Sequence, residues 1–243
     1  MASLTPLLST KNVKRHFGGL KAVDGIDFTL YEGEIRAIIG PNGAGKTTFV
    51  SLLSGRTEVS DGTITFAGED VTRLPAYKRV QRGIAYTFQI TNIYPTKTAA
   101  ENVRIAVESR AARLRDATFD RDEATRAALE AVGLADREET LAGELAYGHQ
   151  RLLEVAMGLA LQPKLLILDE PTQGLSDPEI ENFLALVRQI AKSATVLLIE
   201  HNMHVVMSLA DRISVLTRGT LLAEGTPEEI RDNPDVQAAY LGA

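Results

Sequence analysis

The sequence has no cysteine, no apolar run close to the roughly 18 residues of a membrane span, and no apolar segment near residue 1 that resembles a secretory signal. The lack of cysteine excludes disulfides and thiolate metal sites and is typical of a reducing compartment. Residues 1–10 are too short and too polar for a secretory signal. We therefore expect a soluble chain whose role at any membrane depends on a partner.

An excess of basic residues is also missing. The formal net charge is -6 and the isoelectric point is near 5.3, which argues against a general nucleic-acid partner. At 243 residues the chain is long enough for one α/β domain with an inserted lobe.

One stretch carries a specific chemical signal. Residues 40–48 match the phosphate-binding pattern G-x-x-x-x-G-K-[ST], between an apolar run and a helical pattern. Glycines let the backbone curl around a pyrophosphate, and a helix that starts near the last glycine directs its positive end at the anion. The predicted nucleotide-binding residues are Gly40, Pro41, Asn42, Gly43, Ala44, Gly45, Lys46, Thr47 and Thr48.

Three side chains of this loop have separate predicted roles. Lys46 would reach the β- and γ-phosphates, Thr47 would coordinate Mg²⁺, and Thr48 would meet the α-phosphate. We therefore expect a site for a nucleoside triphosphate with Mg²⁺.

The rest of the chain predicts an α/β fold. Residues 7–17 and 23–30 alternate apolar and polar side chains, which predicts an antiparallel β-layer that leads into a buried strand at 34–39. Further strands are expected at 62–68, 84–88, 165–168, 195–199, 213–217 and 221–223, and helices at 99–112, 122–132, 150–161, 178–191 and 203–210, followed by two short helices interrupted at Pro234. The alternation predicts a parallel sheet with helices on both faces and a helical lobe set into it.

A second cluster of chemistry follows the apolar run 165–168. A buried parallel strand would deliver Asp169 at its carboxyl end, beside the phosphate loop, where this side chain can hold Mg²⁺. Glu170 would face the attacking water as general base. The alternative is an acidic strand end that caps the next helix.

His201 comes at the end of the next predicted strand, 195–199. Because neighbouring parallel strands end side by side, His201 is expected near Glu170, although a single histidine at a strand end is more often structural. His204 makes only a weak metal pattern with His201, and we assign it to the following helix.

Residues 145–149 form a second candidate anion site. Leu145, Ala146, Tyr147, Gly148 and His149 place a small residue and a glycine just before a helix. A single nucleotide needs only one such phosphate-binding segment from its own chain, so the phosphate loop does not explain why a second one is present.

With this set the chain resembles the ATP-binding cassette (ABC) ATPases. The order matches across nearly the whole chain: the phosphate loop, Gln89 in the position of the Q-loop, the signature at residues 145–149, Asp169 and Glu170, a D-loop at 174–177, and the switch histidine His201. The resemblance implies a P-loop NTPase fold of the ABC type. It further implies an ATP-binding core at 1–89 and 161–243 and an inserted helical signature lobe at 90–160.

The resemblance also implies roles for individual residues. Phe17 is similar to the aromatic residue that stacks on adenine, with a core strand position as the alternative. Gln89 is similar to the residue that senses Mg²⁺ and the γ-phosphate, with an ordinary polar strand end as the alternative. Residues 145–149 would complete the ATP site of another subunit in a head-to-tail dimer.

Two departures from the family pattern concern that shared site. Ala146 stands where the signature has serine, so a hydroxyl that would reach the partner's γ-phosphate is missing. A hydrogen bond to a charged group is worth roughly 1.5–3 kcal/mol. Tyr147 and His149 replace glycine and glutamine, while Gly148 remains. We expect a working but slower shared site.

Several short sequence segments resemble those of a narrower group, the ATP-binding subunits of bacterial branched-chain (hydrophobic) amino-acid importers. The similar segments are residues 17–23, 87–89, 145–148, 200–203 and 239–242. That resemblance implies a second ATPase subunit, identical or not, two membrane permeases, a periplasmic solute-binding protein that acts indirectly, and a place at the cytoplasmic face of the inner membrane. It also implies that residues 90–98 receive a permease helix. The alternative is a surface loop pinned by Ile90, Ile93 and Tyr94.

Other functional classes stay open from the sequence. The cargo could be another small solute such as urea, because the ATPase contacts no cargo in this family. A soluble ABC ATPase that acts on ribosomes or DNA usually resembles two cassettes in tandem or carries a long coiled-coil insert, and this chain has neither. A kinase or GTPase would share the phosphate loop but would leave residues 145–149 unexplained.

Overall fold

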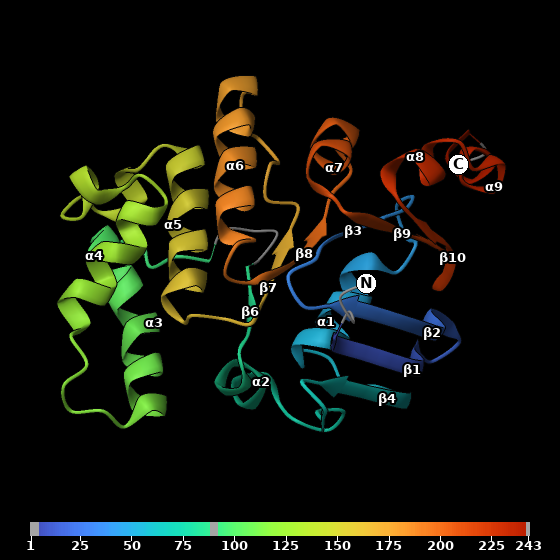
Figure 1. Ribbon diagram of the computed structural model, residues 1–243, viewed down its shortest axis with the longest axis horizontal. Helices are drawn as coiled ribbons and strands as arrows, with labels where there is room; N and C mark the ends of the chain where they lie inside the picture. The colour runs from blue at the N-terminus through green and yellow to red at the C-terminus, as the bar shows by residue number, and fades with distance from the viewer. Residues whose placement is uncertain (1–4, 88–91, 242–243) are drawn as a thin grey trace.

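The computed structural model describes residues 5–87 and 92–241, and its centre is a six-stranded sheet in the order β10-β9-β3-β8-β7-β6 (Figure 1). The neighbouring pairs from β9 to β6 are parallel, and β10 is antiparallel to β9. The strands are β3 (Ile35–Ile39), β6 (Ile84–Tyr86), β7 (Leu165–Asp169), β8 (Thr195–Ile199), β9 (Arg212–Thr217) and β10 (Thr220–Gly225).

A second, antiparallel sheet has the order β2-β1-β4-β5. Its strands are β1 (Pro6–Phe17), β2 (Leu20–Tyr31), β4 (Asp61–Phe66) and β5 (Glu69–Asp70). In Figure 1 β1, β2 and β4 lie at one end of the molecule, and α3, α4 and α5 lie at the other.

The helices fill the two faces of the large sheet and the inserted lobe. They are α1 (Lys46–Ser54), α2 (Ala76–Arg82), α3 (Ala99–Leu114), α4 (Arg121–Ala131), α5 (Tyr147–Ala160), α6 (Asp177–Ile190), α7 (Met203–Leu209), α8 (Pro227–Arg231) and α9 (Pro234–Leu241). Single 3₁₀ turns occur at Ala135–Arg137 and Ala142–Glu144.

Alternation along β7 shows how the two faces divide the core. Leu166 and Leu168 belong to the apolar cluster formed with α3, α5 and α6. Leu165 and Ile167 belong to the other cluster, with Phe49 of α1 and the second sheet. Because successive strand residues point to opposite faces, a strand buried on both sides reads as a continuous apolar run. This explains the unbroken run before Asp169.

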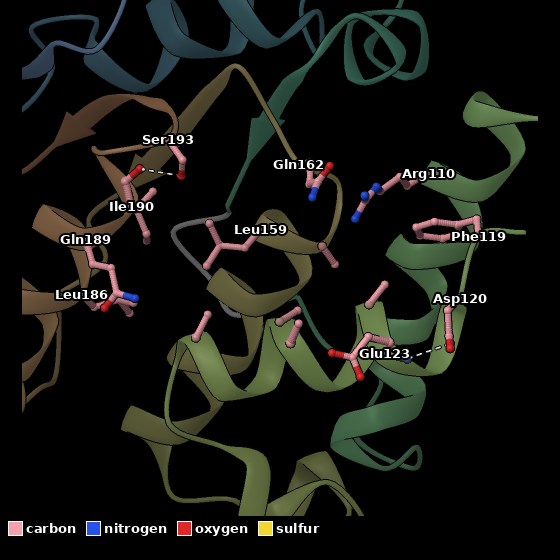
Figure 2. Close-up of a pocket in the computed structure, with 15 residues that line it drawn as sticks. Arg110, Phe119, Asp120, Glu123, Leu159, Gln162, Leu186, Gln189, Ile190 and Ser193 are labelled. Atoms are coloured by element: carbon pink, nitrogen blue, oxygen red, sulfur yellow. Dashed lines mark hydrogen bonds between the residues drawn. The ribbon is translucent and has the colours of Figure 1, made fainter. Parts of the chain in front are cut away.

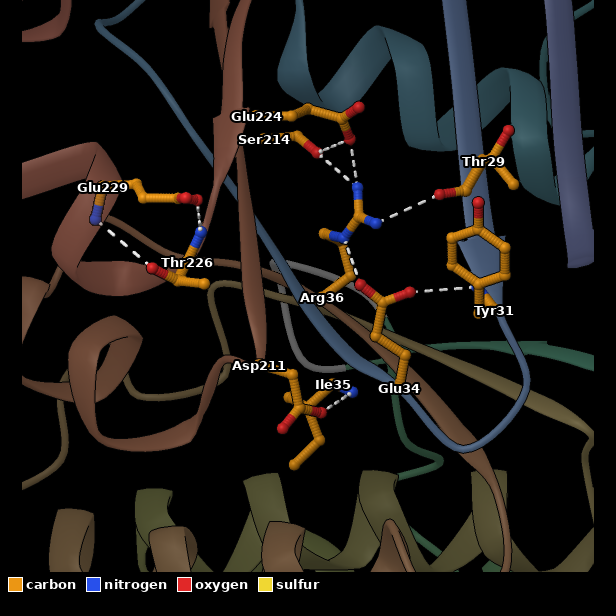
Figure 3. Close-up of polar contacts among 10 residues, drawn as sticks. All are labelled: Thr29, Tyr31, Glu34, Ile35, Arg36, Asp211, Ser214, Glu224, Thr226 and Glu229. Carbon is orange, nitrogen blue, oxygen red and sulfur yellow. Dashed lines mark hydrogen bonds and ion pairs between the residues drawn. The ribbon is translucent and has the colours of Figure 1, made fainter. Parts of the chain in front are cut away.

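A buried arginine joins the two sheets at the far side of β3 (Figure 3). The Arg36 side chain is 1% exposed and donates to Glu34, Ser214, Glu224 and the carbonyl of Thr29. Since β3, β9, β10 and β2 all contribute, this hydrogen-bonded cluster fixes the antiparallel sheet against the edge of the parallel one.

The predicted fold class is confirmed, and several element boundaries differ from prediction. The sequence pattern missed α2, which contains few apolar residues. Helix α5 begins at Tyr147, three residues before the predicted start at 150. The two short helices expected after residue 226 are present as α8 and α9, and Pro234 is the first residue of α9, in keeping with the preference of proline for a first helical turn.

Within the described part of the chain, none of the helices is both long and apolar enough to cross a bilayer.

Candidate active site

The phosphate loop runs from the end of β3 to the start of α1, as predicted. Gly45 is the N-cap of α1 with a left-handed φ of 98°. A Cβ at this position would lie 2.3 Å from the Ala22 carbonyl oxygen, so only glycine fits. The Gly219 amide donates to the Ala44 carbonyl at 2.9 Å, so the β9–β10 hairpin supports the loop from behind.

Lys46 points back over its own loop. Its Nζ donates to the carbonyls of Gly40 at 2.7 Å and Pro41 at 3.2 Å. Burial lowers the pKa of Lys46, while the carboxylates of Glu170 and Asp169 act in the opposite direction. The ammonium therefore lies between the loop carbonyls and two acidic groups, where a phosphate would find a positioned cation.

The loop forms the floor of a cleft of about 590 Å³. Its volume lies in the range of small-molecule sites. Besides loop residues, the cleft is lined by Glu170, by Lys21 and by Arg218, and Thr47 is exposed toward solvent. The three cationic side chains, Lys21, Lys46 and Arg218, suit a polyanionic ligand. The lining residues are Leu20, Lys21, Ala22, Asn42, Gly43, Ala44, Gly45, Lys46, Thr47, Thr48, Glu170 and Arg218.

Asp169 ends β7 and has no exposed surface. Strand β8 lies between β7 and β3, so the strand that carries Asp169 is not the direct neighbour of the strand that leads into the phosphate loop. Asp169 and the loop are near each other because both follow the carboxyl edge of the same parallel sheet. Burial raises the pKa of Asp169, against a hydrogen bond from Tyr86. Its Oδ1 is buried with no hydrogen-bond partner among the described residues.

Glu170 and His201 come together at neighbouring strand ends, as predicted. The His201 Nδ1 lies 3.9 Å from the Glu170 Oε1. Glu170 has a left-handed φ of 47°, and its amide donates to the Ile199 carbonyl at 2.9 Å. A non-glycine residue in this region costs free energy and is more frequent at functional sites. The His201 side chain is 62% exposed and lies next to Glu170, which lines the cleft, although His201 is not itself among the lining residues.

Sequence reasoning gave no role to Glu200, whose side chain is 1% exposed. Its two oxygens accept bonds from the Thr172 amide and hydroxyl and from the amides of His201 and Asn202. The carboxylate thus ties the segment after Glu170 to the segment that carries His201. The sequence shows an acidic residue next to His201, but it does not show that the Glu200 side chain points inward, toward Thr172.

Tyr86 was also missed. Its hydroxyl donates to the Asp169 Oδ2 at 2.6 Å, and the Arg56 guanidinium lies 4.8 Å from the centre of its ring. The only signal in the sequence was its position, three residues before Gln89. Gln89 itself lies outside the described residues.

Residues 145–149 lie at the amino end of α5, and none of them lines the phosphate-loop cleft. Ala146 is the N-cap residue and is exposed; the Tyr147 side chain is 45% exposed. Gly148 packs so closely on α6 that a Cβ would lie 2.3 Å from the Glu179 Oε1. The His149 Nδ1 is buried with no hydrogen-bond partner among the described residues. The segment thus lies beside Leu175 and Glu179 and does not line its own cleft.

Phe17 ends β1 beside the cleft residues of β2, and its ring is 47% exposed. The core strand position, weighed above as an alternative, is therefore wrong. The Arg15 guanidinium stacks 4.4 Å from the ring centre. The ring leaves a free face for an aromatic ligand.

A separate hollow of about 430 Å³ lies among α3, α4, α5 and α6 and is lined by Arg110, Phe119 and several alanines (Figure 2). None of its lining residues belongs to the motifs above, so it is not a rival for the nucleotide site.

Comparisons with known proteins agree with this geometry. The ABC transporter family model matches residues 23–173, and the model described as branched-chain amino acid ATP-binding cassette transporter matches residues 220–243. The chain is 40% identical to the high-affinity branched-chain amino acid transport ATP-binding proteins BraF of Pseudomonas aeruginosa and LivG of Escherichia coli K12, with 98% of this chain and 98% of each relative covered.

A solved structure shows the same fold over the whole chain. The crystal structure of MJ1267 in its ADP conformation, an ATP-binding cassette of an ABC transporter, superposes with a TM-score of 0.87 at 28% identity. The match covers 98% of this chain and 100% of that one.

Proposed function

The chain belongs to the ATP-binding subunits of the ABC transporters, and we propose that it powers import of branched-chain or other hydrophobic amino acids through partner permeases. The observation that carries this proposal is the pair of full-length relatives at 40% identity, both named for branched-chain amino acid transport. The match of residues 220–243 to a branched-chain family model supports it independently, because that segment lies outside the general cassette match.

The enzyme is an ATPase, and the cleft has the parts that phosphoryl transfer to water requires. The backbone amides of residues 40–48 would hold the phosphates, and Lys46 would leave the Gly40 carbonyl to neutralise the β- and γ-phosphates. Thr48 would reach the α-phosphate. Phe17 would stack on the adenine with its exposed face.

The residues present fit a Mg²⁺ ion. The Asp169 Oδ1 is a buried carboxylate oxygen without a partner among the described residues, which is costly unless a cation or water satisfies it. Thr47 at the first turn of α1 supplies a hydroxyl, and Gln89 completes the proposed set. When bound, Mg²⁺ would neutralise charge that develops on the phosphate oxygens.

Glu170 would orient and deprotonate the attacking water, and His201 would donate to the transferred phosphoryl group. Glu170 lines the cleft, and the His201 Nδ1 lies 3.9 Å from its Oε1. The hydrogen bond from the Glu170 amide to Ile199 and the Glu200 contacts hold this edge in place.

A second ATPase subunit, identical or not, would complete the site. Ala146 and Tyr147 at the amino end of α5 are exposed and do not line their own cleft. A helix amino terminus favours anions, so residues 145–149 would bind the γ-phosphate held by the partner.

A permease would dock on the loop that follows Gln89. Asn102 of α3 accepts a hydrogen bond from the Tyr94 amide at 2.8 Å and donates one to the Tyr94 carbonyl at 3.1 Å, so the loop backbone is fixed to this helix. The Tyr94 ring is nevertheless 52% exposed, whereas Ile93 packs against the core. Ile90 lies outside the described residues. A fixed loop that presents an aromatic ring suits a docking surface, and through it the chain would associate peripherally with the inner membrane.

Uptake in the native cell tests the proposal. The gene is deleted, and accumulation of labelled leucine and of labelled urea is measured with wild-type or Glu170→Gln protein restored from a plasmid. We expect leucine uptake only with the wild-type chain. If the wild-type chain restored urea uptake but not leucine uptake, the proposed cargo would be wrong. If the deletion reduced the uptake of neither solute, the assignment as an importer subunit would be refuted.

The double variant Asn92→Glu, Tyr94→Glu tests the docking surface separately. It should keep basal ATP hydrolysis in the purified protein and fail to restore leucine uptake. Normal uptake with this variant would rule out residues 92–98 as the docking site.

A further inference from the structure

Tyr86 is the last residue of β6, the edge strand beside β7. The register pairs Tyr86 with Ile167, so the tyrosine ring can reach along β7 to its carboxyl end. There the hydroxyl donates to the Asp169 Oδ2 at 2.6 Å, across 83 residues of sequence. This is a short, charge-assisted bond in a part of the molecule with little solvent.

The Tyr86 ring is itself held in place. The Arg56 guanidinium, in the turn after α1, lies 4.8 Å from the ring centre, a distance typical of a cation–π contact. The ring and the hydroxyl of Tyr86 are thus both engaged, the ring with Arg56 and the hydroxyl with Asp169.

The two oxygens of Asp169 consequently differ. Oδ2 is occupied by Tyr86, whereas Oδ1 has no partner among the described residues, although both belong to a side chain with no exposed surface. A carboxylate held at one oxygen has a fixed rotamer. The other oxygen is then aimed in one direction and available to a cation.

We propose that Tyr86 is a positioning residue for the Mg²⁺-binding carboxylate of Asp169. It would select Oδ1 as the oxygen that serves the ion and pre-orient it before nucleotide binds. The inference rests on the Mg²⁺ assignment made under the proposed function. The alternative is that the bond only satisfies a buried hydroxyl, as buried tyrosines generally require.

The test is Tyr86→Phe, which removes the hydroxyl and keeps the ring on Arg56. Tyr31→Phe, at the end of β2, is the matched control, because no hydrogen bond of its hydroxyl is found among the described residues. Binding of a fluorescent, non-hydrolysable ATP analogue is titrated with Mg²⁺, and binding is also measured in EDTA. Thermal melts in EDTA check that both variants fold.

We expect the Tyr86→Phe protein to need a roughly 10- to 100-fold higher Mg²⁺ concentration for half of the Mg²⁺-dependent gain in affinity for the ATP analogue. This is the usual cost of losing a residue that hydrogen-bonds to a metal ligand. Its affinity for the analogue in EDTA should be unchanged. Tyr31→Phe should match the wild type. An unchanged Mg²⁺ requirement in Tyr86→Phe, or an equal loss of affinity in EDTA, would overturn the proposal. If the affinity of the wild-type protein for the analogue did not depend on Mg²⁺, the proposed Mg²⁺ site itself would be refuted, and the proposed role of Tyr86 would be refuted as a consequence.

Discussion

Glu200 accepts a 3.0 Å hydrogen bond from the Thr172 amide and a second bond from the Thr172 hydroxyl, which joins two loops that lie 28 residues apart in sequence. Thr172 follows Glu170 by two residues, and Glu200 precedes His201. The segments that carry the proposed base, Glu170, and the proposed switch histidine, His201, therefore share one buried carboxylate as their anchor. The geometry at the cleft edge depends on this contact and not on either loop alone.

Glu200→Gln should weaken both the fold and the reaction. The amide has one acceptor oxygen, so it cannot serve the Thr172 pair and the amides of His201 and Asn202 together. Leaving buried donors unpaired costs about 1–3 kcal/mol of unfolding free energy. Urea denaturation and steady-state ATP hydrolysis measure the two effects. Glu130→Gln, at an exposed position of α4, should change neither. A Glu200→Gln protein as stable and active as the wild type would show that the contact is dispensable.

Glu170→Gln should separate binding from hydrolysis. The amide keeps the shape of the side chain but cannot accept the water proton, so turnover should fall roughly 10²–10⁴-fold. Nucleotide affinity should stay near the wild-type value, because the phosphate contacts come from residues 40–48. Phosphate release and binding of a fluorescent ATP analogue are measured on the same preparation. Hydrolysis at the wild-type rate would remove Glu170 from the role of base.

Arg79 on α2 should be a major stability residue. Its side chain is 1% exposed and donates to the carbonyls of Leu52, Leu53, Thr72 and Leu74. Arg79→Met leaves these acceptors without that donor, which we expect to cost roughly 3 kcal/mol or more. Arg82→Met changes an exposed ion pair on the same helix and should cost less than about 1 kcal/mol. Denaturant midpoints of the two variants give the comparison, and equal midpoints would contradict the prediction.

This helix also shows where reasoning from the sequence ends. The phosphate loop, Asp169, Glu170 and His201 could be predicted because their spacing is local and their strands are continuous apolar runs. Helix α2 could not, since it is fixed by Arg79 to the carboxyl end of α1 and has little apolar periodicity of its own. Tyr86 and Glu200 were missed for the same reason: their partners are set by strand order, which no local pattern contains.

The early start of α5 has a similar cause. Tyr147 and Gly148 favour helix weakly, so the pattern indicated a start at Gln150. In the structure the helix nevertheless begins at Tyr147, and the Glu179 side chain lies against Gly148. A contact from a segment distant in sequence, which no local pattern contains, is therefore present at the proposed anion-binding terminus.

Glu179 should give the stability a defined acid dependence. Hydrogen bonds from the Ser176 hydroxyl and amide hold the pKa of Glu179 below its usual value of 4.5. A lowered carboxyl pKa adds stability that is complete above about pH 4.5 and is lost as the pH falls through the lower folded value. Glu179→Gln should therefore melt below the wild type at pH 7, and the gap should narrow in acid. Glu130→Gln, at an exposed position of α4 with no ion pair found among the described residues, should follow the wild type at both pH values. A gap that does not change with pH would refute the charge argument.

Ala146→Ser should improve both stability and turnover. Ala146 is the N-cap of α5 with an extended backbone and no side-chain cap, and a serine there would accept from the first turn. Such caps stabilise by about 0.5–2 kcal/mol. The same hydroxyl would be exposed at the surface proposed to meet the partner's γ-phosphate, where a charged hydrogen bond adds roughly 1.5–3 kcal/mol, so the ATPase rate at saturating ATP should rise several-fold. Calorimetry measures the first effect on the free protein, and the rate is measured on the dimer. A higher melting temperature with an unchanged rate would mean that residue 146 only caps its own helix and that the shared site is built from other residues.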